Sequence, residues 1–129
     1  MRRVLRHPAP WFAAFALWFA TLWQLSSQAN RFPPGLSFRF SDKVLHFGYF
    51  FGGGILFASF LFRLSPERPD WSRIVGLTVI VLALSGALDE WHQSMVPFRS
   101  GNDPWDFTAD VLGALCGALL FRKTHRLLR

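Results

Sequence analysis

Four apolar runs without a charged residue constrain this chain more than any other feature of its sequence. They occupy residues 8–30, 44–62, 74–88 and 111–121, and charged or proline-rich segments separate them. The chain is 51% hydrophobic and holds 15 Phe and 6 Trp in 129 residues, more than a soluble core of this size could bury. The runs therefore predict an all-α membrane bundle of four transmembrane helices.

The predicted bundle is a single domain that covers residues 1–129. We expect its helices at about residues 10–27, 43–62, 73–93 and 105–121.

Lys and Arg flank these helices unequally. Ten lie on one side: Arg2, Arg3, Arg6, Arg63, Arg68, Arg73, Arg122, Lys123, Arg126 and Arg129. Four lie on the other: Arg31, Arg39, Lys43 and Arg99. The positive-inside rule then places both termini of this multi-pass membrane protein in the cytoplasm.

The net charge of +6 is explained by this topology. The basic residues flank apolar runs and form no RRM, helix-turn-helix or zinc-finger pattern, so we expect no nucleic-acid partner. Attraction to anionic lipids of the inner leaflet accounts for the basic tail, residues 122–129. The single cysteine, Cys116, excludes an intramolecular disulfide.

A cleaved secretory signal is the alternative for the first run. Arg2, Arg3 and Arg6 precede it, and residues 27–29 resemble a small-residue cleavage site. The length of the run and its three tryptophans at positions 11, 18 and 23 favour a retained helix instead.

The lengths of the third and fourth runs predict that acidic residues enter the membrane. A helix needs about 20 residues to cross a hydrocarbon layer of roughly 30 Å. The eleven residues of run 111–121 rise roughly 16 Å, so Asp110 must lie below the outer surface. The fifteen residues of run 74–88 rise roughly 22 Å, which places Asp89 and Glu90 there as well.

Ionisable groups are costly in lipid unless they face one another or water. Helical spacing puts Asp89 near Gln93, Asp106 near Asp110, and Lys43, His46 and Tyr49 near one another. We therefore predict a polar pocket in the outer leaflet. Its candidate residues are Lys43, His46, Tyr49, Asp89, Glu90, His92, Gln93, Arg99, Asp106 and Asp110. The alternative is an ion-pair network that locks the bundle and has no other role.

Small residues indicate where the helices approach closely. Gly52, Gly53 and Gly54 lie mid-way along the second helix, and Gly113 and Gly117 form a small-xxx-small face on the fourth. We predict a helix-packing role for all five. A phosphate-binding role is disfavoured because Lys and Ser or Thr do not follow the glycine run, which lies within an apolar segment.

The polar segments of residues 42–121 resemble the VanZ-like family of bacterial multi-pass membrane proteins. They read Asp-Lys-Val-Leu-His-Phe-Gly-Tyr at 42–49, Asp-Glu-Trp-His-Gln at 89–93, Pro-Phe-Arg at 97–99, and Asp-Phe-Thr-Ala-Asp-Val-Leu-Gly at 106–113, followed by Gly117. Asp110 is a departure, since many members carry Asn there. The resemblance implies a multi-pass protein of the bacterial cytoplasmic membrane, related to one that contributes to glycopeptide resistance, particularly to teicoplanin. The family has no established biochemical activity.

Two functions from different classes fit this pattern. In the first, the pocket binds or modulates a membrane lipid, a cell-wall precursor or an amphipathic glycopeptide-type antibiotic, and Lys43 and Arg99 engage an anionic part. In the second, the protein is a membrane enzyme acting on a lipid-linked substrate. His46 or Glu90 is then the general base, Asp89 or Asp110 its partner, and Arg99 stabilises developing charge. Binding is the preferred hypothesis.

Other functions have less support. A metal site would use His46, His92 and a carboxylate, but ligand spacings such as H-E-x-x-H are lacking, so we expect no metal and no cofactor. A transporter is disfavoured because ionisable residues do not continue toward the cytoplasmic half. Homo-oligomerisation stays open.

Overall fold

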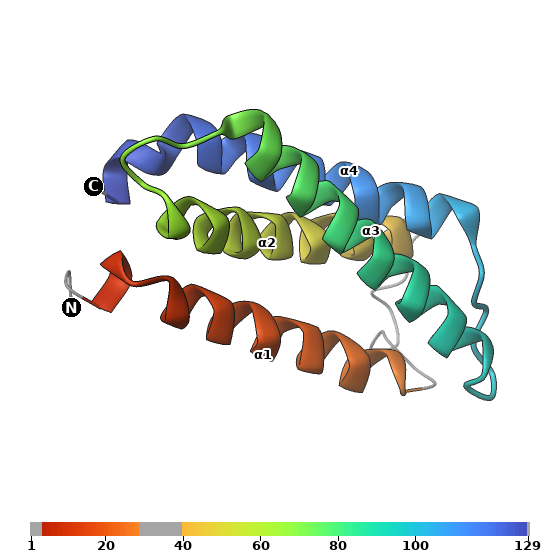
Figure 1. The fold of residues 1–129 in the computed structure, drawn as a ribbon. Helices are drawn as coiled ribbons and strands as arrows, with labels where there is room; N and C mark the ends of the chain where they lie inside the picture. The colour runs from red at the N-terminus through yellow and green to blue at the C-terminus, as the bar shows by residue number, and fades with distance from the viewer. Residues whose placement is uncertain (1–3, 29–39, 129) are drawn as a thin grey trace.

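The computed structural model describes residues 4–28 and 40–128, and within these ranges the regular structure is entirely helical, without a β-strand. The helices are α1 (Pro8–Ser26), α2 (Ser41–Leu64), α3 (Trp71–Ser94) and α4 (Pro104–Thr124), with short 3₁₀ helices η1 (Val4–Arg6) and η2 (His125–Leu128). The four long helices form one bundle, and η1 and η2 lie at the same end of it (Figure 1). The predicted all-α class with four helices is confirmed.

Side-chain caps and prolines explain where the helices begin. Pro8 and Pro104 occupy the first turns of α1 and α4, where a missing backbone N–H costs nothing. The carboxylate of Asp70 accepts a hydrogen bond from the Arg73 amide at 3.0 Å, and that of Asp103 accepts one from the Trp105 amide at 2.8 Å. Because α4 starts at Pro104, the uncharged run 111–121 is only its later part, and Asp106 and Asp110 belong to the helix.

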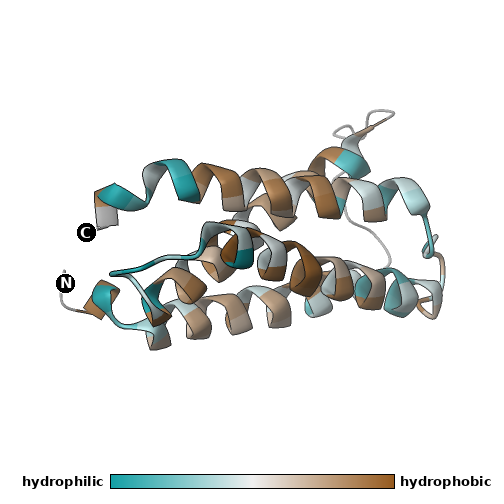
Figure 2. Ribbon diagram, turned by 45° about the horizontal axis from the view of Figure 1, so that its top comes forward, coloured by the Kyte–Doolittle hydropathy of each residue, from teal (hydrophilic) through white to brown (hydrophobic). Residues whose placement is uncertain are grey.

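Three segments are long and apolar enough to cross a membrane: α2 (Ser41–Leu64), α3 (Trp71–Ser94) and Pro104–Leu127, in which α4 continues into η2. Each has 24 residues. Such a helix is about 36 Å long, more than a hydrocarbon core of roughly 30 Å requires. Hydrophobic residues occupy the middle of the helices and hydrophilic residues lie toward their ends (Figure 2). α1, at 19 residues, is not among the three, since Pro and Trp lower its hydropathy.

α2 packs most extensively on α4, and glycines allow this close approach. A Cβ atom on Gly54 would overlap the carbonyl group of Ala114. On the opposite helix, Cβ atoms on Gly113 and Gly117 would overlap the carbonyl oxygens of Phe47 and Phe51. The two backbones therefore lie in contact, as in other small-xxx-small interfaces.

The other two glycines of the 52–54 run differ from each other. Gly53 faces α1 and α3: a Cβ there would lie 2.6 Å from two ring carbons of Trp18 and 3.0 Å from Leu82. The helix-packing role predicted for Gly52 does not agree with the structure. A Cβ on Gly52 would meet no described atom within 4 Å, because this residue lies on the face of α2 that points away from the neighbouring helices.

α1 joins the bundle through aromatic packing and a pair of hydrogen bonds. Phe15, Trp18 and Leu22 pack against Phe50 and Phe57 of α2 in the main core cluster. The Trp18 indole N–H donates to the Tyr49 carbonyl at 3.0 Å, while the Tyr49 hydroxyl donates to the Trp18 carbonyl at 2.8 Å. These bonds fix the register of α1 on α2 at the level of Tyr49.

Candidate functional site

Buried polar side chains gather at the end of the bundle opposite η1 and η2. The C-terminal ends of α1 and α3 meet the N-terminal ends of α2 and α4 there (Figure 1). The buried polar residues of this end are Ser26, Ser41, His46, Asp89, Glu90, Gln93, Asp106 and Asp110. We refer to these residues, together with Asp42, Lys43, Arg99 and Asp103 around them, as the polar cluster. Such burial requires mutual hydrogen bonds and ion pairs.

His46 lies at the centre of the polar cluster and is 3% exposed. Its Nδ1 atom is 2.8 Å from Oδ1 of Asp110. Its Nε2 atom is 3.9 Å from Oδ2 of Asp106 and 4.0 Å from Oδ1 of Asp42. Asp106 and Asp110 are four residues apart, so α4 presents both carboxylates to the imidazole from one face.

Lys43 binds the start of α4. Its ammonium group lies 2.8 Å from Oδ1 of Asp106 and 3.0 Å from Oδ2 of Asp103. The hydrogen bond from Lys43 holds the pKa of the Asp103 carboxyl below its usual value, and the bond from the Trp105 amide acts in the same direction. Lys43 is therefore already neutralised by two carboxylates, which argues against its predicted role as a site for an anionic ligand.

Arg99 is also held by partners within the protein. One terminal nitrogen donates to the Gln93 side-chain oxygen at 2.6 Å. The other lies 3.1 Å from the carbonyl oxygen of Gln28 and 3.4 Å from those of Leu25 and Ser26. A cation among these last carbonyls stabilises the C-terminus of α1. Arg99 thus joins the loop after α3 to the end of α1, instead of pointing a free guanidinium into a pocket.

Asp89 is the member of the cluster that connects α3 to α1. The Ser26 hydroxyl donates to its Oδ1 atom, and the Gln93 amide donates to its Oδ2 atom at 2.7 Å. Ser26 is not among the pocket residues predicted from the sequence. Its signal was a hydroxyl at the end of the first apolar run, which is too common at helix ends to be informative by itself.

Glu90 holds the loop between α3 and α4. Its Oε2 atom accepts a hydrogen bond from the Asp103 amide at 2.8 Å, and its carbonyl accepts one from the Asn102 amide at 3.3 Å. Gly101 lies so close to the end of α3 that a Cβ would overlap the Glu90 carbonyl and the Ser94 backbone. The other carboxylate oxygen of Glu90, Oε1, is buried and has no hydrogen-bond partner in the described part of the chain.

Two predicted pocket residues lie apart from the carboxylates. The His92 ring stacks on Trp23 of α1, with ring centroids 3.9 Å apart and planes inclined by 12°. The Tyr49 hydroxyl binds the Trp18 carbonyl. His92 belongs to neither of the groups around His46 that could hold a metal ion in the described part of the chain, so the hypothetical metal site built on His46 and His92 does not fit this arrangement.

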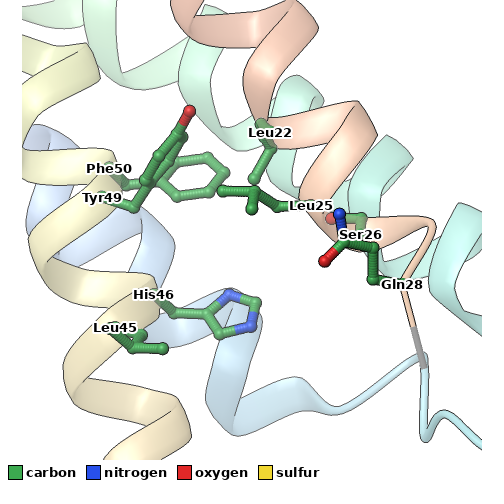
Figure 3. A pocket seen from close by; sticks show the side chains of 8 residues that line it. All are labelled: Leu22, Leu25, Ser26, Gln28, Leu45, His46, Tyr49 and Phe50. Carbon is green, nitrogen blue, oxygen red and sulfur yellow. The ribbon is translucent and has the colours of Figure 1, made fainter. Parts of the chain in front are cut away.

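A pocket of about 150 Å³ lies between α1 and α2 beside the polar cluster (Figure 3). Its lining combines apolar and polar side chains: Leu22, Leu25, Leu45 and Phe50, with Ser26, Gln28, His46 and Tyr49. His46 belongs to both the pocket and the cluster, since its ring lines the pocket while Nδ1 contacts Asp110. The site thus offers an apolar slot with acceptor-rich groups at one end.

Comparisons of the chain with protein-family models, with curated proteins and with solved structures gave no match. The chemistry of the site therefore carries the functional argument.

Proposed function

We propose that this chain is a four-span protein of the bacterial cytoplasmic membrane, related to the VanZ-like family, with both termini in the cytoplasm. α1 has 19 residues and a length of about 28 Å, which suits a fourth crossing flanked by interfacial tryptophans. The positions of η1 and η2 at one end of the bundle agree with the basic flanks of the sequence (Figure 1). The polar cluster then lies in the outer leaflet.

We propose that the pocket between α1 and α2 binds an amphipathic envelope molecule, such as a membrane lipid, a lipid-linked wall precursor or a glycopeptide-type antibiotic. The observation that carries this proposal is the lining of the pocket, with four apolar side chains beside His46, Ser26 and Gln28. An acyl chain packs on the apolar residues, and a headgroup reaches the polar ones.

The volume and charge of the site restrict the occupant further. About 150 Å³ is below the roughly 300–1,000 Å³ of pockets that enclose a whole drug-sized ligand, so the pocket holds part of an amphiphile and the rest lies in the bilayer. Carboxylates surround His46, and Lys43 and Arg99 are engaged by protein groups. The site therefore favours a headgroup with N–H donors or an ammonium group over an exposed anion.

Photo-crosslinking tests this proposal. The full chain is placed in vesicles that contain phosphatidylethanolamine with a diazirine on its acyl chain. The vesicles are irradiated, and mass spectrometry identifies the residues that are crosslinked to the lipid. We expect crosslinks concentrated in residues 22–28 and 45–50 and reduced by unlabelled lipid. Crosslinks spread evenly over outward-facing residues such as Ile80 and Leu84, 56% and 66% exposed, would contradict a specific pocket.

The His46–Asp110 pair supports a second candidate, a membrane enzyme. A carboxylate that orients an imidazole beside a substrate pocket is the arrangement of a general base. In that case His46→Gln abolishes turnover of a lipid-linked substrate and leaves crosslinking to the pocket intact. Loss of both together, or no turnover by the wild type, would leave binding as the function.

A further inference from the structure

Three buried side chains at the centre of the polar cluster are arranged as metal ligands. His46 of α2 and Asp89 and Glu90 of α3 each place one ligand atom within 4.8 Å of the other two. Zn²⁺ binds nitrogen and oxygen at about 2.0–2.2 Å and Ca²⁺ binds oxygen at about 2.3–2.6 Å, so ligand atoms around one ion lie roughly 3–5 Å apart. The three atoms fit one coordination sphere.

Two carboxylate oxygens of the polar cluster lack partners, and one of them belongs to a residue of this group. Oε1 of Glu90 and Oδ2 of Asp110 are buried without a hydrogen bond in the described part of the chain. Glu90 is 4% exposed and Asp110 is 0% exposed. A buried carboxylate oxygen without a donor is costly, and a bound cation removes this cost.

The basic residues nearby are committed to other contacts. Lys43 binds Asp103 and Asp106, while Arg99 binds Gln93 and the carbonyls at the end of α1. Asp89 and Glu90 nevertheless place two adjacent carboxylates beside the His46 imidazole. A cation at this point would offset the concentration of negative charge.

We propose that His46, Asp89 and Glu90 bind a divalent transition-metal ion, and that Asp110 orients the imidazole from its Nδ1 side. One imidazole with carboxylates suits Zn²⁺ or Mn²⁺ better than Mg²⁺ or Ca²⁺, which prefer oxygen ligands throughout. The hydrogen bond from His46 to Asp110 is the usual support for a histidine ligand. This inference does not depend on the lipid proposed for the neighbouring pocket.

A second group, Asp42, His46 and Asp106, is a weaker candidate for the same ion. The Asp42 side chain is 39% exposed. The group with Asp89 and Glu90 is buried throughout, which favours it as the primary site.

Manganese binding to the purified full chain in detergent tests the proposal. After chelator treatment, Mn²⁺ is titrated and the loss of the free-ion EPR signal gives its affinity, and Zn²⁺ is tested by competition. We expect one saturable site, displaced by Zn²⁺ and weakened at least tenfold in Glu90→Gln. Glu67→Gln is the matched control, because Glu67 is an exposed acid in the loop between α2 and α3.

Thermal unfolding separates ligation from a purely structural role. Glu90→Gln keeps a side-chain oxygen for the Asp103 amide, so we expect it to fold without metal. Zn²⁺ should then raise the Tm of the wild type and of Glu67→Gln but not that of Glu90→Gln. If Glu90→Gln does not fold, Asp89→Asn provides the same comparison. No saturable binding by the wild type, or equal binding by the control and ligand variants, would overturn the proposal.

Discussion

The imidazole Nδ1 of His46 lies 2.8 Å from the carboxylate Oδ1 of Asp110, and the two residues belong to the helices that pack most extensively, α2 and α4. Both side chains are almost fully buried. A charged or strongly polar contact in this position holds the α2–α4 interface in register, because no shifted register would pair the same groups. His46 also lines the pocket between α1 and α2, so the contact with Asp110 also fixes the position of this lining residue.

Asp110 variants test the role of this contact in stability. Asp110→Leu leaves the His46 imidazole without its partner, so we expect a loss of about 1–3 kcal/mol in the free energy of unfolding. Asp110→Asn retains a side-chain oxygen and should lose less. Unfolding of the purified protein in mixed micelles measures both. Equal stability of the Leu variant and the wild type would show that the contact does not hold the helices together.

Two neighbouring glycines provide a matched test of the α2–α4 contact. Gly54→Ala places a methyl group against the Ala114 backbone, and overpacking of this kind costs about 1–3 kcal/mol. Gly52→Ala meets no described atom within 4 Å and should be neutral or stabilise the helix by up to about 1 kcal/mol. The unfolding assay used for Asp110 compares them. A larger loss for Gly52→Ala than for Gly54→Ala would contradict the helix interface.

Cysteine labelling tests the topology proposed for α2, α3 and α4. In a Cys116→Ser background, we expect a membrane-impermeant maleimide to label Gln28→Cys and Ser100→Cys in intact spheroplasts. Glu67→Cys and Thr124→Cys should react after lysis alone, because these positions lie at the basic end of the bundle. Labelling of Gln28→Cys and Glu67→Cys from the same side would exclude a crossing by α2, the helix between these positions.

A cellular test addresses the role in the envelope. We expect expression of the chain to reduce susceptibility to teicoplanin, and Leu25→Trp to remove this effect by filling the pocket at normal membrane level. Teicoplanin susceptibility is measured as growth inhibition in a host that lacks the protein. Immunoblots of membranes control for the level of each variant. Identical susceptibility with and without the chain would separate this protein from the resistance that the VanZ-like resemblance suggests.

Much of this arrangement could be predicted from the sequence, because an uncharged run too short to span the hydrocarbon layer brings the charged residues beside it into that layer. The short runs before Asp89 and after Asp110 placed these residues below the membrane surface, and the structure buries both. Periodicity does not give the rotation of α3 about its own axis, however. His92 is next to the inward-facing Gln93 in the sequence and was predicted to line the pocket, but its ring stacks on Trp23.

Partners distant in sequence were also beyond prediction. Lys43 contacts Asp103 and Asp106, 60 and 63 residues away, and this pairing depends on how α2 and α4 align. The contacts of Arg99 with the end of α1 arise in the same way. Both basic residues were expected to face a ligand, whereas tertiary packing supplies them with protein acceptors.

Native mass spectrometry of the purified chain with phosphatidylethanolamine tests the central claim most directly, through two Leu→Trp variants of α1. Leu25 lines the pocket, whereas Leu17 is 70% exposed and does not line it. We predict that the wild type and Leu17→Trp retain a bound lipid as the detergent is removed in the gas phase, and that Leu25→Trp loses it while keeping the same Tm. Equal lipid retention by Leu25→Trp and Leu17→Trp would contradict binding in the pocket between α1 and α2.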